Sequence, residues 1–113
     1  MSRKYRINYS PDALDDLKDI YSYIAFHLLQ KDTAGKLIAK IRKEIKTLNR
    51  MPERYVLVDW EPWHSTGVHT LLVGNYIAYY RVDNELNTVL IGRILFAGRD
   101  IVDTTLSKDR TQA

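Results

Sequence analysis

Arginine and tyrosine side chains on two consecutive β-like segments are the residues of this chain best suited to chemistry on a phosphate. Tyr79 and Arg81 lie in one segment, Arg93 lies in the next, and Arg99 follows soon after it. A guanidinium group binds phosphate oxygens through two parallel hydrogen bonds and stabilises charge that develops during phosphate chemistry. A tyrosine can hydrogen-bond or stack on a base. These four residues are candidate catalytic residues for RNA cleavage, with salt bridges and packing as the competing roles.

Metal-free RNA cleavage also needs a base that activates the 2′-hydroxyl and an acid for the leaving oxygen. Histidine is the natural residue for both roles because it titrates near neutrality. His64 and His69 lie near the predicted sheet, whereas His27 falls on the apolar edge of a predicted helix and is interpreted as packing. We add His69 to the candidate catalytic residues, with His64 as the other choice, only for the case that the protein is a nuclease.

The chain carries none of the sequence motifs of the common enzyme classes. It has no GxSxG, Walker loop, HExxH or GxGxxG motif. It also has no cysteine, and three scattered histidines are a poor basis for a zinc site. We therefore expect neither a metal nor a cofactor. Whether the protein is an enzyme stays open; if it is one, we expect a metal-independent endoribonuclease.

The two β-like segments, residues 76–82 and 88–95, are expected to form a hairpin, because a short polar connection separates them. The pairing that we expect aligns Val82 with Thr88. It places three pairs on one face of the hairpin: Arg81 with Val89, Tyr79 with Ile91, and Ile77 with Arg93. A slip of one residue on either strand would move the arginines to different faces.

Two amphipathic helices are predicted upstream of this hairpin. Residues 3–9 alternate like a half-buried strand, and Ser10 and Pro11 then mark a helix start. Apolar residues follow on one helical face, at positions 13, 14, 17, 20, 21, 24 and 28, so we expect the polar residues off that stripe, Asp15, Asp16 and Lys18, to be solvated. A second stripe, at positions 34, 37, 38, 41, 45 and 48, predicts a helix that ends before Met51 and Pro52.

Two further groups of residues are candidates for binding a partner. Lys36, Lys40 and Lys43 lie on the outer side of the second helix, where they form either a solvated face or an electrostatic footprint for an anionic partner. Trp60 and Trp63 lie in a loop without clear periodicity. Plugging the edge of the core is the first interpretation of the two tryptophans, and gripping a partner peptide or a base is the alternative.

Length, hydropathy and charge limit the class of protein. The 113 residues suffice for one domain over residues 1–113, with residues 107–113 as a frayed tail. No apolar run approaches the roughly 20 residues of a membrane span, and no apolar stretch follows the basic N-terminus as it would in a secretory signal. We therefore expect a cytoplasmic protein with no membrane partner. The net charge of +3 is uneven: residues 1–58 carry 12 Lys/Arg against 7 Asp/Glu, and residues 59–113 carry 5 against 7.

The predicted elements follow the order strand, helix, helix, strand, strand, strand. We expect an α+β fold in which the N-terminal strand, a helical hairpin and a three-stranded antiparallel meander form one small sheet with the helices on one face.

Four segments in this order resemble the RelE/ParE superfamily of type II toxin-antitoxin toxins, over about residues 5–106. The first two segments are Tyr9-Ser10-Pro11-x-Ala13-x-x-Asp16-Leu17-x-x-Ile20-x-x-Tyr23-Ile24 and Ile41-x-x-x-Ile45-x-x-Leu48-x-x-x-Pro52. The other two are Asn75-Tyr76-Ile77-Ala78-Tyr79-Tyr80-Arg81-Val82-Asp83 and Val89-x-Ile91-x-Arg93-Ile94-Leu95-x-x-x-Arg99-Asp100.

The resemblance implies a growth-inhibiting toxin, of the kind used in plasmid stabilisation, encoded beside an antitoxin that wraps around it and neutralises it. The superfamily has two branches. RelE-like toxins are ribosome-dependent mRNA endoribonucleases that use lysines and arginines on the sheet and often a C-terminal tyrosine or histidine. ParE-like toxins are thought to poison DNA gyrase and lack that catalytic set. We expect the antitoxin to contact the helices and the surface near Trp60 and Trp63.

The chain departs from the RelE-like branch at three places. The strand at residues 68–73 has no lysine, Ile77 stands where RelE-like toxins tend to place a phosphate-binding arginine, and no tyrosine or histidine follows Arg99. Action on DNA gyrase is therefore favoured. A ribosome-dependent mRNA endoribonuclease is the alternative, and a non-toxic relative that only binds its antitoxin is a third reading.

Overall fold

The computed structural model describes residues 4–55, 57–59 and 61–97. The strands are β1 (Arg6–Tyr9), β2 (His69–Val73), β3 (Tyr76–Asp83) and β4 (Thr88–Phe96). The helices are α1 (Pro11–Ser22), which continues into a π-helical turn η1 (Tyr23–His27), and α2 (Lys31–Lys46), followed by short 3₁₀ turns η2 (Thr47–Asn49) and η3 (Pro52–Arg54). The predictions for Arg99, Trp60 and the tail at 107–113 concern positions outside the described residues.

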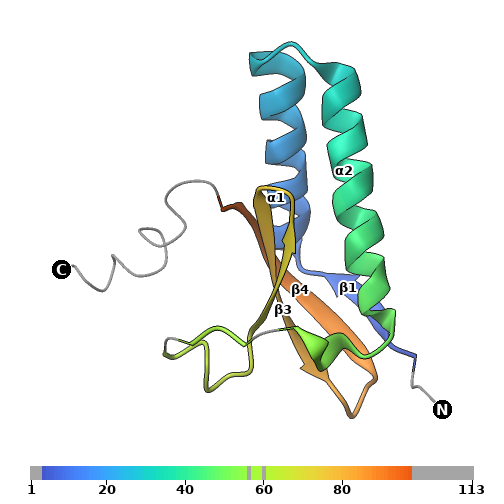
Figure 1. The fold of residues 1–113 in the computed structure, drawn as a ribbon, viewed down its shortest axis with the longest axis vertical. Helices are drawn as coiled ribbons and strands as arrows, with labels where there is room; N and C mark the ends of the chain where they lie inside the picture. Colours follow the sequence, from blue (N-terminus) through green and yellow to red (C-terminus); the bar gives the residue numbers. More distant parts are fainter. Residues whose placement is uncertain (1–3, 56, 60, 98–113) are drawn as a thin grey trace.

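The four strands form one mixed sheet in the order β1-β4-β3-β2. Strands β2, β3 and β4 make an antiparallel meander, and β1 lies parallel to β4 at its edge. Figure 1 shows α1 and α2 side by side as a helical hairpin, with the sheet below them. The predicted fold class and the predicted order of elements are confirmed.

The core lies between the helical hairpin and one face of the sheet. The apolar stripe predicted on α2 supplies its centre, because Ile41 and Ile45 are completely buried there. Tyr80, Val89 and Ile91 point from the sheet into the same cluster. The other sheet face, which includes Tyr79, Arg81, Leu90 and Arg93, is therefore turned away from the helices.

The register of the β3–β4 hairpin differs from the predicted one. Thr88 pairs with Asp83 instead of Val82, and Arg81 pairs with Leu90. The physical reason is the turn, which is shorter than predicted. The Asp83 carboxylate accepts hydrogen bonds from the backbone N–H groups of Glu85 and Leu86, at 3.0 and 3.1 Å, and so fixes Asp83 as the last strand residue.

A β-bulge in β4 then shifts the register a second time. The pairing passes from Tyr80 with Ile91 to Tyr79 with Arg93, so Gly92 is the extra residue. Without this bulge the first shift would place Arg93 on the helix side of the sheet. With it, Tyr79, Arg81 and Arg93 share the outer face, as predicted, although the pairs that bring them there are different.

The helical hairpin turns through a residue in an unfavourable backbone conformation. Leu29 has a φ of +56° and is 83% exposed. The next N–H, that of Gln30, donates to the carbonyl of Ile24, six residues earlier, at 3.0 Å, and this hydrogen bond caps the wide last turn of the helix. That cap favours glycine, because an L side chain in the left-handed region costs about 1 kcal/mol.

Replacing Leu29 by glycine is therefore expected to raise the free energy of unfolding by about 0.5–1 kcal/mol, although it removes a large apolar side chain. Urea titrations of the antitoxin-free protein would measure the change. The matched control is Leu28→Gly, because Leu28 is exposed with a negative φ of −96°, and this change is expected to destabilise the protein. Equal effects of the two substitutions would show that backbone conformation does not decide the outcome.

Candidate functional site

The outer face of the sheet forms one wall of an open groove of about 650 Å³. The loop between η3 and β2 forms the other wall. Side chains of β3 and β4 alternate between the two sheet faces, so Tyr80 and Ile91, which border the groove, belong to the core on the helix side. The lining residues are Ser10, Val58, Trp63, Thr66, Val68, Tyr79, Tyr80, Arg81, Leu90, Ile91, Gly92, Arg93 and Leu95.

Arg81 and Tyr79 are two of the polar side chains that line this groove. Arg81 is exposed, and its guanidinium makes no ion pair or hydrogen bond with any described residue. Tyr79 is half-buried, and burial raises the pKa of its phenol. Tyr79 is therefore neutral at pH 7, where it donates a hydrogen bond but is a weak base. Together they present donors, one of them charged, to the groove.

Arg93 lies beside them but is held by an aspartate of α1. Its Nε and Nη2 donate to the two carboxylate oxygens of Asp16, at 2.8 and 2.9 Å. This bidentate hydrogen bond is the main cause that raises the pKa of Arg93, against the effect of burial. Two of its three nitrogens are therefore engaged within the protein.

Asp16 itself is 8% exposed, so the prediction that it is solvated is wrong. The helical period explains its position: residue 16 lies between Ala13, Leu17 and Ile20 on the face of α1 that meets the sheet. Its carboxylate also accepts a third hydrogen bond, at 2.8 Å, from the backbone N–H of Ile94. The pairing of β1 with β4 ends at Tyr9 and Ile91. Beyond that point, the Asp16 carboxylate takes the place of a neighbouring strand as the hydrogen-bond acceptor for the Ile94 N–H.

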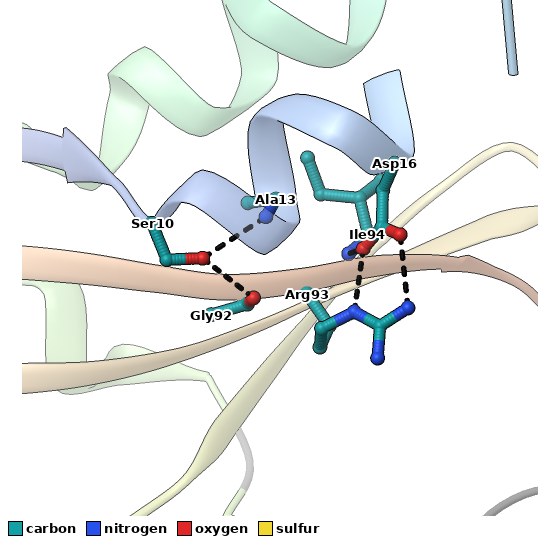
Figure 2. A network of polar contacts seen from close by, with 6 residues as sticks. All are labelled: Ser10, Ala13, Asp16, Gly92, Arg93 and Ile94. Carbon is teal, nitrogen blue, oxygen red and sulfur yellow. Dashed lines mark hydrogen bonds and ion pairs between the residues drawn. The ribbon is translucent and has the colours of Figure 1, made fainter. Parts of the chain in front are cut away.

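Ser10 fixes the same region from the start of α1 (Figure 2). Its hydroxyl accepts a hydrogen bond from the N–H of Ala13 as the helix N-cap, at 2.9 Å. The same hydroxyl donates to the carbonyl of Gly92 in the bulge, at 2.8 Å. The first turns of α1 therefore hold the bulge that brings Arg93 to the outer face.

The candidate histidines lie away from the arginines. His69 is buried on the helix side of the sheet, where its ring stacks on Tyr80 at 5.3 Å between centroids. Its Nδ1 donates to the carbonyl of Tyr55, at 2.9 Å. His64 donates from Nδ1 to the carbonyl of Val58 at 2.8 Å and does not line the groove. The structure therefore does not bring either histidine together with Arg81 and Arg93.

The predicted partner-binding residues occupy two separate surfaces. Trp63 lines the groove and is 45% exposed, which contradicts its first interpretation as a plug at the edge of the core. Lys36, Lys40 and Lys43 are exposed on α2, which covers the opposite face of the sheet. One partner would have to wrap around the domain to touch both surfaces.

Sequence reasoning missed the apolar walls of the groove and a second hollow of about 600 Å³ on the helical hairpin. Leu14, Tyr21, Ile38 and Arg42 are among the residues that line this hollow. The Arg42 guanidinium also lies 4.9 Å from the ring centre of Tyr9. The sequence does contain a sign of this hollow. Leu14 belongs to the apolar stripe of α1, yet it lies at the edge of that stripe and stays exposed beside α2.

Neither a metal cluster nor a membrane span is found in the described part of the chain. No three His, Cys, Asp or Glu side chains there are close enough to hold one ion. The described helices are also too short or too polar to cross a bilayer.

Residues 7–101 match the model of a protein family described as the ParE toxin of the type II toxin-antitoxin system, parDE. No individually curated protein sequence matches the chain.

Several solved structures share the fold. A chain of the chromosomal ParDE system from P. aeruginosa superposes with a TM-score of 0.68 at 24% identity, covering 82% of this chain and 96% of that one. A chain of the toxin-antitoxin complex RelBE2 from Mycobacterium tuberculosis gives 0.60 at 24% identity, covering 82% and 98%. A mutant of the E. coli toxin RelE in the free state gives 0.61 at 14% identity, covering 93% and 96%.

Proposed function

The chain belongs to the ParE toxin family of type II toxin-antitoxin systems, and from this premise we propose that it arrests bacterial growth by acting on DNA gyrase. A cognate antitoxin neutralises it. The family model shows that the chain belongs to the toxin family. What we propose is the target of the toxin, DNA gyrase.

The observation that carries the choice of target is the absence of an acid-base pair from the groove. Among the described residues that line it, none is a histidine, aspartate or glutamate. His69 is on the other face of the sheet, Arg93 is engaged by Asp16, and Tyr79 has a raised pKa. Arg81 alone can stabilise charge but cannot move a proton near neutrality. This arrangement supports action by binding more than RNA hydrolysis.

One observation favours a second candidate function. Tyr79, Arg81 and Arg93 lie together on the outer face, in a groove with Trp63 at its rim. Cations beside aromatic rings suit an RNA strand. The alternative is therefore a ribosome-dependent, metal-independent mRNA endoribonuclease, for which the ribosome or the RNA would have to supply the missing acid and base.

The antitoxin partner is supported by the structural neighbours, several of which are solved as toxin-antitoxin systems or complexes. The exposed lysines of α2 suit an acidic segment of such a partner, because opposite surface charges steer and orient association. Both candidate targets are cytoplasmic, and we place the chain there. Maintenance of a plasmid or of a chromosomal segment would follow from the toxin-antitoxin pair.

The test is a supercoiling assay with purified gyrase and relaxed plasmid. The toxin is purified with its antitoxin, separated in denaturant and refolded. We expect it to inhibit supercoiling in a dose-dependent way, and equimolar antitoxin to restore the activity. The DNA relaxation activity of topoisomerase I in the same buffer is the control, and it should not change. Full gyrase activity in the presence of refolded toxin that still binds its antitoxin would contradict the proposal.

A further inference from the structure

We propose that the exposed face of α2 binds the phosphate backbone of duplex DNA, so that the toxin contacts the DNA segment held by gyrase as well as the enzyme itself. This inference deepens the proposed function and rests on it for the source of the DNA, because gyrase acts on a duplex. The site lies on the helical hairpin and is separate from the groove on the outer sheet face.

The two helices of the hairpin carry opposite charges. In α1 there are four aspartates and one lysine, whereas α2 carries six Lys/Arg against Asp32 and Glu44. A surface whose charges serve only solubility mixes both signs. The concentration of cations on one helix therefore points to an anionic partner for that helix.

Three lysines form the outward face of α2 (Figure 1). Lys36, Lys40 and Lys43 follow one another at spacings of four and three residues, on the side opposite to the completely buried Ile41 and Ile45. The three side chains are exposed and make no ion pair or hydrogen bond with any described residue. Like charges at these spacings destabilise a helix. An anionic ligand on this face would remove that repulsion.

The helix dipole explains only part of this row. Cations in the last turn of a helix are stabilised by the partial negative charge of its C-terminus, and this applies to Lys43 and Lys46. The effect is confined to the last turn, so it does not reach Lys36 and Lys40. These two lysines in the middle of α2 are the ones that call for a ligand.

The face lacks the apolar side chains that other anionic partners need. None of the exposed large hydrophobic residues in the described part of the chain belongs to α2, and the small residues Gly35 and Ala39 lie beside the lysines. A bound peptide is anchored by buried aromatic or apolar side chains, and a single-stranded nucleic acid by bases that stack on aromatic rings. A duplex backbone needs neither, because the release of counterions supplies the affinity.

The spacing of the lysines also suits a duplex. An α-helix rises about 1.5 Å per residue, so Lys36 and Lys43 lie about 10 Å apart along its axis. Duplex DNA carries one negative charge per roughly 1.7 Å of its own axis, so a straight row of this length meets several phosphates. The lysines also suit an acidic segment of the antitoxin, so the antitoxin and DNA would compete for this face.

The first experiment measures DNA binding by the refolded toxin without gyrase. The probe is a fluorescein-labelled duplex of about 20 base pairs and arbitrary sequence, and anisotropy follows its binding over a range of salt concentrations. Three phosphate contacts predict that log K falls with log[salt] with a slope of about −3. A single strand of the same length and a polyglutamate peptide are expected to bind at least about fivefold more weakly. Equal or tighter binding of either one would overturn the proposal.

Two matched triple variants then locate the site. The first combines Lys36→Gln, Lys40→Gln and Lys43→Gln. The control removes three exposed cations that lie off the outward face of α2, through Lys4→Gln, Lys18→Gln and Lys31→Gln. We expect the first variant to lose at least about tenfold in affinity for the duplex and most of its salt dependence, and the control to lose less than about threefold. Equal losses would show that net charge alone binds DNA, and would overturn the proposal.

Circular dichroism and thermal melts identify any variant that fails to fold. If the first triple variant does not fold, the three single substitutions replace it. Each of them is expected to reduce the salt slope by about one. Three folded single variants with an unchanged slope would overturn the proposal.

The gyrase supercoiling assay tests the link to the target. We expect the first triple variant to need at least about tenfold more toxin for half-inhibition than the wild type, and the control variant to match the wild type. Equal inhibition by the first variant and the wild type would overturn the contact with DNA on gyrase. A wild-type toxin that binds the duplex through α2 but leaves gyrase active would contradict only the proposed target. Failure of the site and failure of the target can therefore be told apart.

Discussion

Replacing Asp16 by alanine is expected to lower the free energy of unfolding by about 3 kcal/mol. The substitution removes three hydrogen bonds, two from the Arg93 guanidinium and one from the Ile94 backbone. It leaves the Ile94 N–H without a partner at the edge of β4, and an unpaired buried donor costs about 1–3 kcal/mol. The Arg93 side chain is 49% exposed, so water can replace the two hydrogen bonds that its guanidinium loses and offsets part of the cost. Urea unfolding of the antitoxin-free protein would measure the change.

The neighbouring residue supplies a matched control. Asp15 is exposed on the same helix, and Asp15→Ala is expected to change stability by less than about 0.5 kcal/mol. Asp16→Asn should fall between the two, because an amide oxygen can still accept from Ile94 but its NH₂ group faces Arg93. A double-mutant cycle with Arg93→Ala should give a coupling energy of at least about 1 kcal/mol. Equal results for Asp15→Ala and Asp16→Ala would show that Asp16 does not join α1 to the sheet.

Replacing Ile45 by alanine is expected to lower the free energy of unfolding by about 3–4 kcal/mol. Ile45 is completely buried between α2 and the sheet, so the substitution loses apolar contact and leaves a cavity that the surrounding side chains fill only in part. Ile45→Val removes one methylene group and should cost about 1 kcal/mol. Thermal and urea unfolding would measure both.

The exposed neighbour Lys46 gives the control for helix propensity. Lys46→Ala is expected to be close to neutral, since alanine and lysine are both good helix formers. If Ile45→Ala lowers the free energy of unfolding by less than about 1 kcal/mol, the core does not lie between the helical hairpin and the sheet.

The sequence predicted the helices and the layer order because each depends on local periodicity. The stripe through Ile41 and Ile45 identified the buried face of α2, and Ser10 with Pro11 identified the start of α1. The register of the β3–β4 hairpin depends instead on individual hydrogen bonds and on one extra residue, which have no periodic pattern. The Asp83 carboxylate shortens the turn, and the bulge at Gly92 adds a residue to β4. The alternation of apolar residues contains no sign of either feature. The predicted residue pairs were therefore wrong, although the prediction that the two arginines share one face of the sheet was correct.

The site was harder to predict than the fold because its key contacts join distant parts of the chain. Asp16 and Arg93 are 77 positions apart, and the helical pattern of α1 gave only a polar residue next to an apolar stripe. His69 could have been recognised as a core residue, since it alternates with Leu71 and Val73 on β2. The roles of Arg81, Tyr79, Arg93 and His69 in any reaction stay predictions, as do the partner-binding roles of Trp63 and the lysines of α2.

The most direct test of the central claim is to sequence the 5′ ends of cellular mRNA shortly after the toxin is induced without its antitoxin, while the DNA-damage response is monitored in the same culture. If the toxin acts on gyrase, we expect growth arrest with DNA-damage signalling, and the mRNA ends should be the same as in the uninduced culture. Growth arrest with new mRNA ends at defined codon positions, dependent on translation and without DNA-damage signalling, would contradict the account and favour the ribosome-dependent endoribonuclease.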